Sequence, residues 1–350
     1  MTITFIEFLN NLISVPSLAI ISILILGVLL VNSLTDAPNT IVTCISTRAL
    51  DTKKATIMGV VCNFLGVFVT ALLDAKVAYT IYNMVNFGEN TSNALIALCV
   101  TMFTIVIWAY LTGKYGIPTS QSHSLIAGLT GASIAINGNL NGINGHEWLK
   151  VIYGIIIAVV LSFFLGFIIA RAIEKICKNM DRRKTNKFFK GTQVFGAAAM
   201  SFLNGAQDGQ KFMGVFMLGV CLANGITGTN TFVIPLWLVL VCSFFMTVGI
   251  PFGVKKITKK VGLKMTKIEA YQGTSADIAS GIVLIISLVF GLPMSTTQSK
   301  NTAVMGVGAS RRLSNVNWNV VKEMLLAWTL TFPGCILLAY LATIVATAII

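Results

Sequence analysis

The chain has 350 residues, of which 55% are hydrophobic and only 11% are charged, and its mean hydropathy is +0.84. Twelve acids and 25 bases are too few to coat a water-soluble protein of this size. Apolar runs long enough to span a bilayer recur from end to end. The composition therefore excludes a soluble globular protein and predicts an all-α polytopic membrane protein.

In chain order, a short interfacial helix is expected before Pro16, followed by ten spans. The spans are expected near residues 17–47, 55–73, 93–112, 118–136, 149–171, 193–222, 231–253, 273–292, 293–310 and 323–349. With the N-terminus outside, most bases fall on one side, including the basic cluster of residues 171–192. The positive-inside rule then places that cluster in the cytoplasm and both termini outside. The net charge of +13 reflects topology and not a nucleic-acid partner.

The first span is interrupted at Asp36, where a charged residue costs about 2.5–3.5 kcal/mol and is read as functional. Pro38 removes a backbone donor and disfavours helix at the residue before it, so the helix is expected to break here. Freed carbonyls, half-helix ends and a carboxylate at membrane depth suit a small-ion site. The alternative is a kinked helix in which a neighbouring helix merely satisfies Asp36.

The same motif recurs at Asp208, inside an apolar segment that is also expected to be broken. An Asn precedes each acid by four residues (Asn32 and Asn204), and an amide follows each one (Asn39 and Gln210). The two acids lie about half the chain apart. Two such interruptions at matching places in the two halves indicate the site of a secondary transporter.

Two further strings also match each other, and each follows one of the acid motifs. They are Gly116-Ile117-Pro118-Thr119-Ser120-Gln121-Ser122-His123 and Gly291-Leu292-Pro293-Met294-Ser295-Thr296-Thr297-Gln298. We name them the first and second hydroxyl strings. Each opens a segment of small residues, and its first-turn amides and hydroxyls could face an anion. An ordinary Ser-rich helix cap is the alternative, but the recurrence favours an anion site.

The two halves are expected to form two inverted-topology repeats with broken helices and paired Ser/Thr hairpin loops. The Asp36 span runs from outside to inside, and the Asp208 span runs the other way. The first repeat covers residues 1–170, a basic cytoplasmic linker covers 171–192, and the second repeat covers 193–350. A pseudo-two-fold axis would bring both acid motifs and both hydroxyl strings together near the midplane.

These four strings resemble the PiT family of inorganic phosphate transporters. The first signature is matched by Asn32, Asp36, Ala37, Asn39, Thr43, Ser46, Thr47, Arg48 and Leu50, and the second by Gly205, Ala206, Asp208, Gln210, Lys211, Met213 and Gly214. The hydroxyl strings match the family's paired serine/threonine loops, and Val316-Asn317-Trp318 and Leu326-Ala327-Trp328 are also similar. The resemblance covers nearly the whole chain.

The resemblance implies a plasma-membrane symporter, not an enzyme, that imports inorganic phosphate with a cation and forms a homodimer. Na⁺ is favoured as the coupling ion over H⁺, and no other cofactor is expected. The implied cation ligands are Asp36, Asn39 and Asp208, which would hold Na⁺, together with Asn32 and Asn204. The implied phosphate ligands are Ser120, Gln121, Ser122, Ser295, Thr296, Thr297, Gln210 and Lys211.

Several residues around these ligands depart from the family's pattern, namely Thr35, Pro38, Asn204, Gln207, Gly209, Gln298 and Lys300. The coupling ion, and to a lesser degree the anion, therefore stay open. His123 could relay protons or be a hydrogen-bonded structural residue. Asp277 and Thr43 are candidates for a supporting role near the ligands. Lys300 is expected to extend toward the cytoplasmic face, with anion contact as the alternative.

Three other functions remain alternatives. A sulfate permease could use the same scaffold, although retention of both acid motifs favours cation-coupled phosphate. A membrane-embedded phosphotransfer enzyme would need a nucleophile or a metal cluster at the membrane edge, and the sequence has no such cluster. A passive channel fits less well, because broken helices with buried acids suit an alternating site.

Overall fold

The computed structural model describes residues 4–88, 90–114, 120–225, 233–259, 266 and 268–349. Over these residues the chain is helical and lacks β-sheet, with two isolated bridges, Val85–Ile143 and Thr266–Val316. Seven of the described helices are long and apolar enough to cross a membrane. The chain is therefore a multi-pass membrane protein, as its composition predicted. Residues 116–119, which open the first hydroxyl string, lie outside the described residues.

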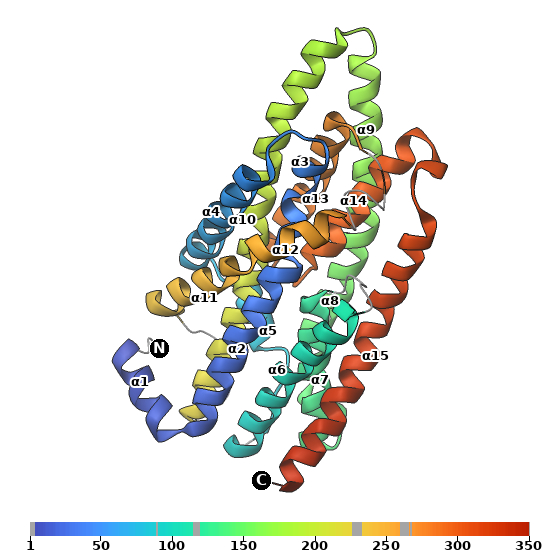
Figure 1. Cartoon of the computed structure of the whole chain (residues 1–350). Helices are drawn as coiled ribbons and strands as arrows, with labels where there is room; N and C mark the ends of the chain where they lie inside the picture. Colours follow the sequence, from blue (N-terminus) through green and yellow to red (C-terminus); the bar gives the residue numbers. More distant parts are fainter. Residues whose placement is uncertain are drawn as a thin grey trace.

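The described elements follow the predicted spans in order (Figure 1). The first half contains α1 (Phe5–Ser14), α2 (Pro16–Thr35), the 3₁₀ segment η1 (Ala37–Ile41), α3 (Val42–Ser46), α4 (Thr52–Leu73), α5 (Lys76–Tyr82), α6 (Thr91–Lys114), α7 (Gln121–Asn137), η2 (Leu140–Gly142), α8 (Gly145–Ile156), the π segment η3 (Ile157–Leu161) and α9 (Ser162–Cys177). The second half contains α10 (Arg182–Ala223), α11 (Leu236–Val248), α12 (Ile250–Ile257), α13 (Ala270–Phe290), α14 (Thr296–Arg311), η5 (Leu313–Asn315) and α15 (Trp318–Ile349).

The first predicted break is confirmed. Helix α2 ends at Thr35, Asp36 is its C-cap, and the chain continues as a 3₁₀ turn before α3 begins. The Asn39 amide bonds to the Asp36 carbonyl over 3.0 Å, which closes the tighter turn. Pro38 explains the change, because it has no N–H to continue the α-helical ladder.

The second predicted break is wrong, because α10 runs without interruption through Asn204 and Asp208. This segment has no proline, so every backbone donor is kept. Its glycines serve close packing against α4 instead. A Cβ added at Gly205 would overlap the Asn63 carbonyl, and one added at Gly209 would lie 2.7 Å from a Val67 methyl group.

The helices that carry the hydroxyl strings, α7 and α14, are almost entirely buried. Helix α7 packs against α15, and α14 packs against α9, so each contacts the last long helix of the opposite half (Figure 1). Gly131 of α7 follows Ser120 at the same spacing as Gly306 of α14 follows Ser295. A Cβ at Gly131 would overlap the Ile336 carbonyl, and one at Gly306 would overlap the Phe163 carbonyl.

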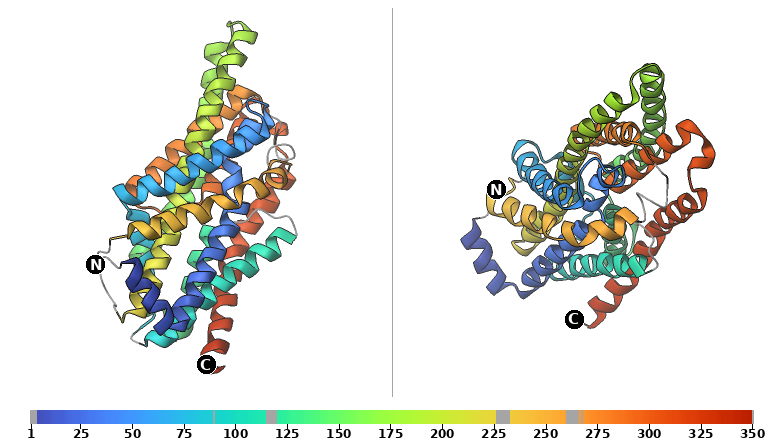
Figure 2. Two further views of the ribbon diagram at one scale, coloured as in Figure 1. Left: turned by 60° about the vertical axis from the view of Figure 1, so that its left-hand side comes forward. Right: turned by 45° about the horizontal axis from the view of Figure 1, so that its top comes forward.

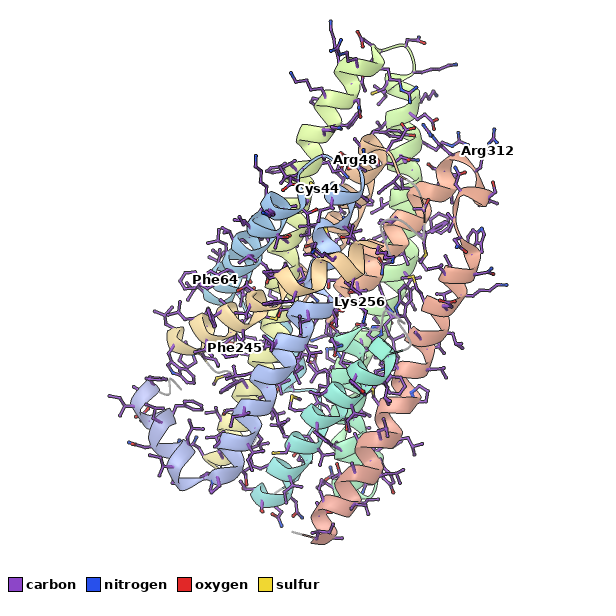
Figure 3. All side chains as sticks on the ribbon, viewed as in Figure 1. Cys44, Arg48, Phe64, Phe245, Lys256 and Arg312 are labelled. Atoms are coloured by element: carbon purple, nitrogen blue, oxygen red, sulfur yellow. The ribbon has the colours of Figure 1, made fainter. Side chains whose placement is uncertain are left out.

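The two ends of the molecule differ. The hairpin of α9 and α10 projects beyond the other helices at one end, whereas α1 and the end of α15 lie toward the other (Figures 1 and 2). Arg48 and Arg312 lie toward the hairpin end, and Phe64 and Phe245 lie on the flank between the ends (Figure 3). Large exposed apolar side chains, such as Phe103, line the helices, as expected of a surface that faces lipid.

Candidate functional site

The centre of the site is a buried ion pair on α10. Lys211 Nζ lies 2.7 Å from Asp208 Oδ1, one turn earlier on the same helix. The ammonium also donates to Ser122 Oγ over 2.7 Å and to the Met294 carbonyl. Its three protons therefore have three acceptors, which offsets the cost of burying the charge.

Asp208 also joins the two hydroxyl strings. Ser122, in the first turn of α7, donates to Asp208 Oδ1 over 3.5 Å, and Thr296, in the first turn of α14, donates to Oδ2 over 3.2 Å. Ser120 caps α7 and Ser295 caps α14, each by accepting a bond from the backbone amide three residues on. The first turn of each helix thus donates a side-chain hydroxyl to the same carboxylate.

Asp36 and Asn39 approach the same place from the broken segment. The Gln121 backbone amide donates to Asp36 Oδ2 over 3.3 Å, and Asn39 Nδ2 donates to Thr297 Oγ1 over 3.4 Å. The Asp36 carboxylate interacts electrostatically with both Asp208 and Lys211. Residues from four separate segments are therefore brought together, as the sequence predicted.

Oxygen atoms at this site suit a cation. Asn39 Oδ1 is buried and accepts no hydrogen bond from any described residue, and it stands one turn from the Asp36 carboxylate. Asn32 and Asn204 are fully buried, and neither side chain has a hydrogen-bond partner among the described residues. Carboxylate and amide oxygens are the ligands that hard cations take, and buried amides left unpaired call for an explanation of this kind.

Two glutamines on α10 position loops. Gln210 accepts a bond from the Val77 amide over 3.1 Å and donates to the Asp74 carbonyl over 2.9 Å, so its side chain holds the start of α5. Gln207, which the sequence did not predict as a site residue, donates to the Leu292 carbonyl over 2.8 Å. It thereby supports the loop whose Met294 carbonyl accepts from Lys211. In the sequence, the position of Gln207 directly before Asp208 is the feature that could have identified it as a site residue.

Among the described residues, no hydrogen bond joins the His123 side chain to Asp36 or Asp208. Its Nδ1 lies 3.4 Å from Gln298 Nε2, and its ring centroid lies 4.8 Å from that of Phe332. The histidine is buried. These contacts hold the imidazole between α7, α14 and α15, and its Nε2 has no hydrogen-bond partner among the described residues.

Lys300 does not extend to the cytoplasmic face, so that expectation is wrong. Its ammonium is buried and forms an ion pair with Asp277, and it donates to Thr43 Oγ1 over 3.2 Å. Thr43 in turn donates to Asp277 Oδ1 over 3.1 Å. Because α13 supplies a carboxylate at this depth, the lysine is neutralised without reaching the membrane surface.

The chain is similar to known proteins over most of its length. The sequence profile of the phosphate transporter family matches residues 32–339. The probable low-affinity inorganic phosphate transporter of Bacillus subtilis (strain 168) is 35% identical over 303 residues, 87% of this chain and 89% of that protein. A protein of the same name from Rhizobium meliloti (strain 1021) is 32% identical over 314 residues, 89% of this chain and 90% of that protein.

The fold also matches a solved structure described as the sodium-dependent phosphate transporter. The TM-score is 0.84 at 20% identity, and the match covers 96% of this chain and all of the other. The family profile and the relatives together cover the acid motifs and the hydroxyl strings that meet in the site. The chain thus belongs to the phosphate transporter family, which is a family of transporters and not of enzymes.

Proposed function

We propose that this protein is a secondary active symporter that imports inorganic phosphate across the plasma membrane together with a cation. One observation carries the proposal. Two buried carboxylates, Asp36 and Asp208, lie next to hydroxyl and amide donors from both hydroxyl strings. Carboxylates suit a cation and the donors suit phosphate, so the two ions would bind side by side.

The charges of the site explain the coupling. When Asp36, Asp208 and Lys211 are all ionised, two negative charges face one positive charge, so a phosphate anion meets a net negative site. Two unit charges 4 Å apart repel by about 4 kcal/mol at the effective dielectric typical of such pairs. A cation bound by Asp36 and Asn39, or by Asp208, removes this repulsion. Each ion then raises the affinity for the other.

The same step would release the phosphate donors. Ser122 and Thr296 donate to Asp208, and a cation on Asp208 would compete for those oxygens. The hydroxyls could then turn to phosphate, joined by Thr297, Lys211 and the first-turn amides of α7 and α14. Ser120, Gln121 and Ser295 would shape these helix ends. Asn32 and Asn204 would supply further oxygens for the cation.

Na⁺ is favoured over H⁺ because the site offers carboxylate and amide oxygens, and because the solved neighbour is described as sodium-dependent. Two inverted repeats, residues 1–170 and 193–350 around the linker 171–192, would give alternating access around a midplane site. The matched packing of α7 on α15 and of α14 on α9 supports this arrangement. Termini outside, the basic hairpin in the cytoplasm and a homodimer complete the proposal.

The test is uptake of labelled phosphate into proteoliposomes, with an inward Na⁺ or H⁺ gradient imposed separately. We expect uptake with the Na⁺ gradient, and its loss in Asp36→Asn and Asp208→Asn. Asp51→Asn is the matched control, because Asp51 is an exposed N-cap and Asn caps equally well. Uptake of sulfate but not phosphate would contradict the proposal, as would uptake that needs no cation.

A further inference from the structure

The proposed transport site leaves a second buried charged cluster unused. Lys300 of α14, Asp277 of α13 and Thr43 of α3 contact one another, and all three side chains are buried. Among the described residues, Asp277 has no ion-pair partner other than Lys300. Helix α10 closes the cluster from another side, since a Cβ added at Gly196 would lie 2.9 Å from Asp277 Cβ.

The matching place in the other half of the chain is apolar. Leu125 stands at the same step after Ser120 as Lys300 does after Ser295. Val215 follows Asp208 as Thr43 follows Asp36, and Met102 precedes the first hydroxyl string as Asp277 precedes the second. All three apolar residues are fully buried in one hydrophobic cluster. The fold therefore does not require charges at this position.

The charged cluster adjoins the candidate cation site. Asn39 and Thr43 lie one turn apart, and Thr296 and Lys300 lie one turn apart on α14. The two segments are joined twice, by Asn39 to Thr297 over 3.4 Å and by Lys300 to Thr43 over 3.2 Å. Asn39, Thr43 and Lys300 also border one small gap, which is too narrow to hold a water molecule. The Lys300 ammonium is thus a fixed positive charge next to the site at Asn39 where a mobile cation is proposed to bind.

We propose that Asp277 and Thr43 form a second monovalent-cation site, which in this protein the Lys300 ammonium fills permanently. A carboxylate and a hydroxyl are oxygen ligands suited to such an ion, and a lysine ammonium supplies the same single charge. Lys300 thereby sets the number of cations that accompany each phosphate. The inference rests on the proposed transport. The oxygen ligands of Asp277 and Thr43 could hold one more cation, but Lys300 occupies their site, so one fewer cation moves with each phosphate.

Removal of Lys300 tests the proposal. In Lys300→Leu the buried Asp277 carboxylate loses its partner, and a cation from solution takes its place and is carried with phosphate. The double variant Lys300→Leu/Asp277→Met reproduces the apolar residues of the matching place. In proteoliposomes at a set membrane potential, the charge moved per phosphate should rise by one elementary charge in the single variant. It should equal the wild-type value in the double variant. An unchanged ratio in Lys300→Leu overturns the proposal.

A second measurement does not depend on transport. The thermal unfolding midpoint of purified protein in detergent is compared in NaCl and in choline chloride, without phosphate. We expect Na⁺ to raise the midpoint of Lys300→Leu by more than that of the wild type or the double variant. An equal shift in all three proteins overturns the proposal. If the wild type takes up no phosphate, the proposed function fails, and this comparison still decides the cation site.

A second single variant guards against misfolding. Lys300→Gln keeps a polar side chain, which is one bond shorter, and adds an amide oxygen as a ligand. It should show the same extra charge per phosphate and the same extra stabilisation by Na⁺. If both single variants fail to fold while the double variant folds, a mobile cation cannot replace the ammonium, and the proposal is overturned.

Discussion

His123 and Gln298 occupy the same position in the two hydroxyl strings, and their side chains meet, with His123 Nδ1 3.4 Å from Gln298 Nε2. The backbone amide of each residue donates a hydrogen bond to the hydroxyl of the capping serine three residues earlier. Because both side chains are buried, the contact ties the first turn of α7 to the first turn of α14. The two helix ends that face the proposed phosphate site are therefore held in a fixed relation.

His123→Leu should lower the free energy of unfolding by about 1–3 kcal/mol, because it leaves the buried Gln298 amide without its partner. His123→Gln should retain most of that stability, since an amide can still bond to Gln298. Reversible unfolding in mixed detergent and SDS micelles measures the difference. Phosphate uptake by His123→Gln should stay within a few-fold of wild type. A selective loss of H⁺-driven uptake in that variant would instead assign His123 to a proton relay.

Lys211→Met should abolish phosphate uptake and lower the free energy of unfolding by about 3–5 kcal/mol, because the buried Asp208 carboxylate loses its ion-pair partner. Adding Asp208→Asn should recover much of the stability but none of the uptake. Lys184→Met, an exposed lysine on the same helix, is the control. Uptake by Lys211→Met near the wild-type rate would remove the ammonium from the transport site.

Gly131→Ala and Gly306→Ala should each lower the free energy of unfolding by about 1–3 kcal/mol, because the added Cβ overlaps a backbone carbonyl of the facing helix. The two losses should be similar, since α7 on α15 and α14 on α9 pack alike. Gly27→Ala has open space around its Cβ and should be neutral or slightly stabilising, because Ala favours helix. A cost at Gly27 equal to that at Gly131 would contradict this account.

Gln210→Leu should destabilise the protein by about 1–3 kcal/mol for each of the two backbone groups left unpaired, the Val77 amide and the Asp74 carbonyl. The phosphate KM should stay within about twofold of wild type, because the side chain faces the start of α5. Uptake at varied phosphate concentration, run beside unfolding, checks both. A tenfold higher KM at unchanged stability would show that Gln210 binds phosphate.

Of the two predicted helix breaks, the one at a proline is confirmed and the one without a proline is wrong. Pro38 removes a backbone donor wherever it stands, so the break after Thr35 could be predicted from one residue. The second motif has an acid in an apolar run but no proline, and α10 is continuous there. The glycines of this stretch admit α4, and that partner could not be inferred from the motif.

The sequence by itself determined the membrane class, the order of the helices, the break at Asp36 and the family, because apolar length, proline and matched motifs act through nearby residues. The tertiary structure alone decided that Lys300 meets Asp277 and that His123 meets Gln298. It also decided that Gln210 bonds to the backbone at Asp74 and Val77 and so holds the start of α5. A buried polar group needs a hydrogen-bond or ion-pair partner, but the sequence around it does not show which helix supplies that partner.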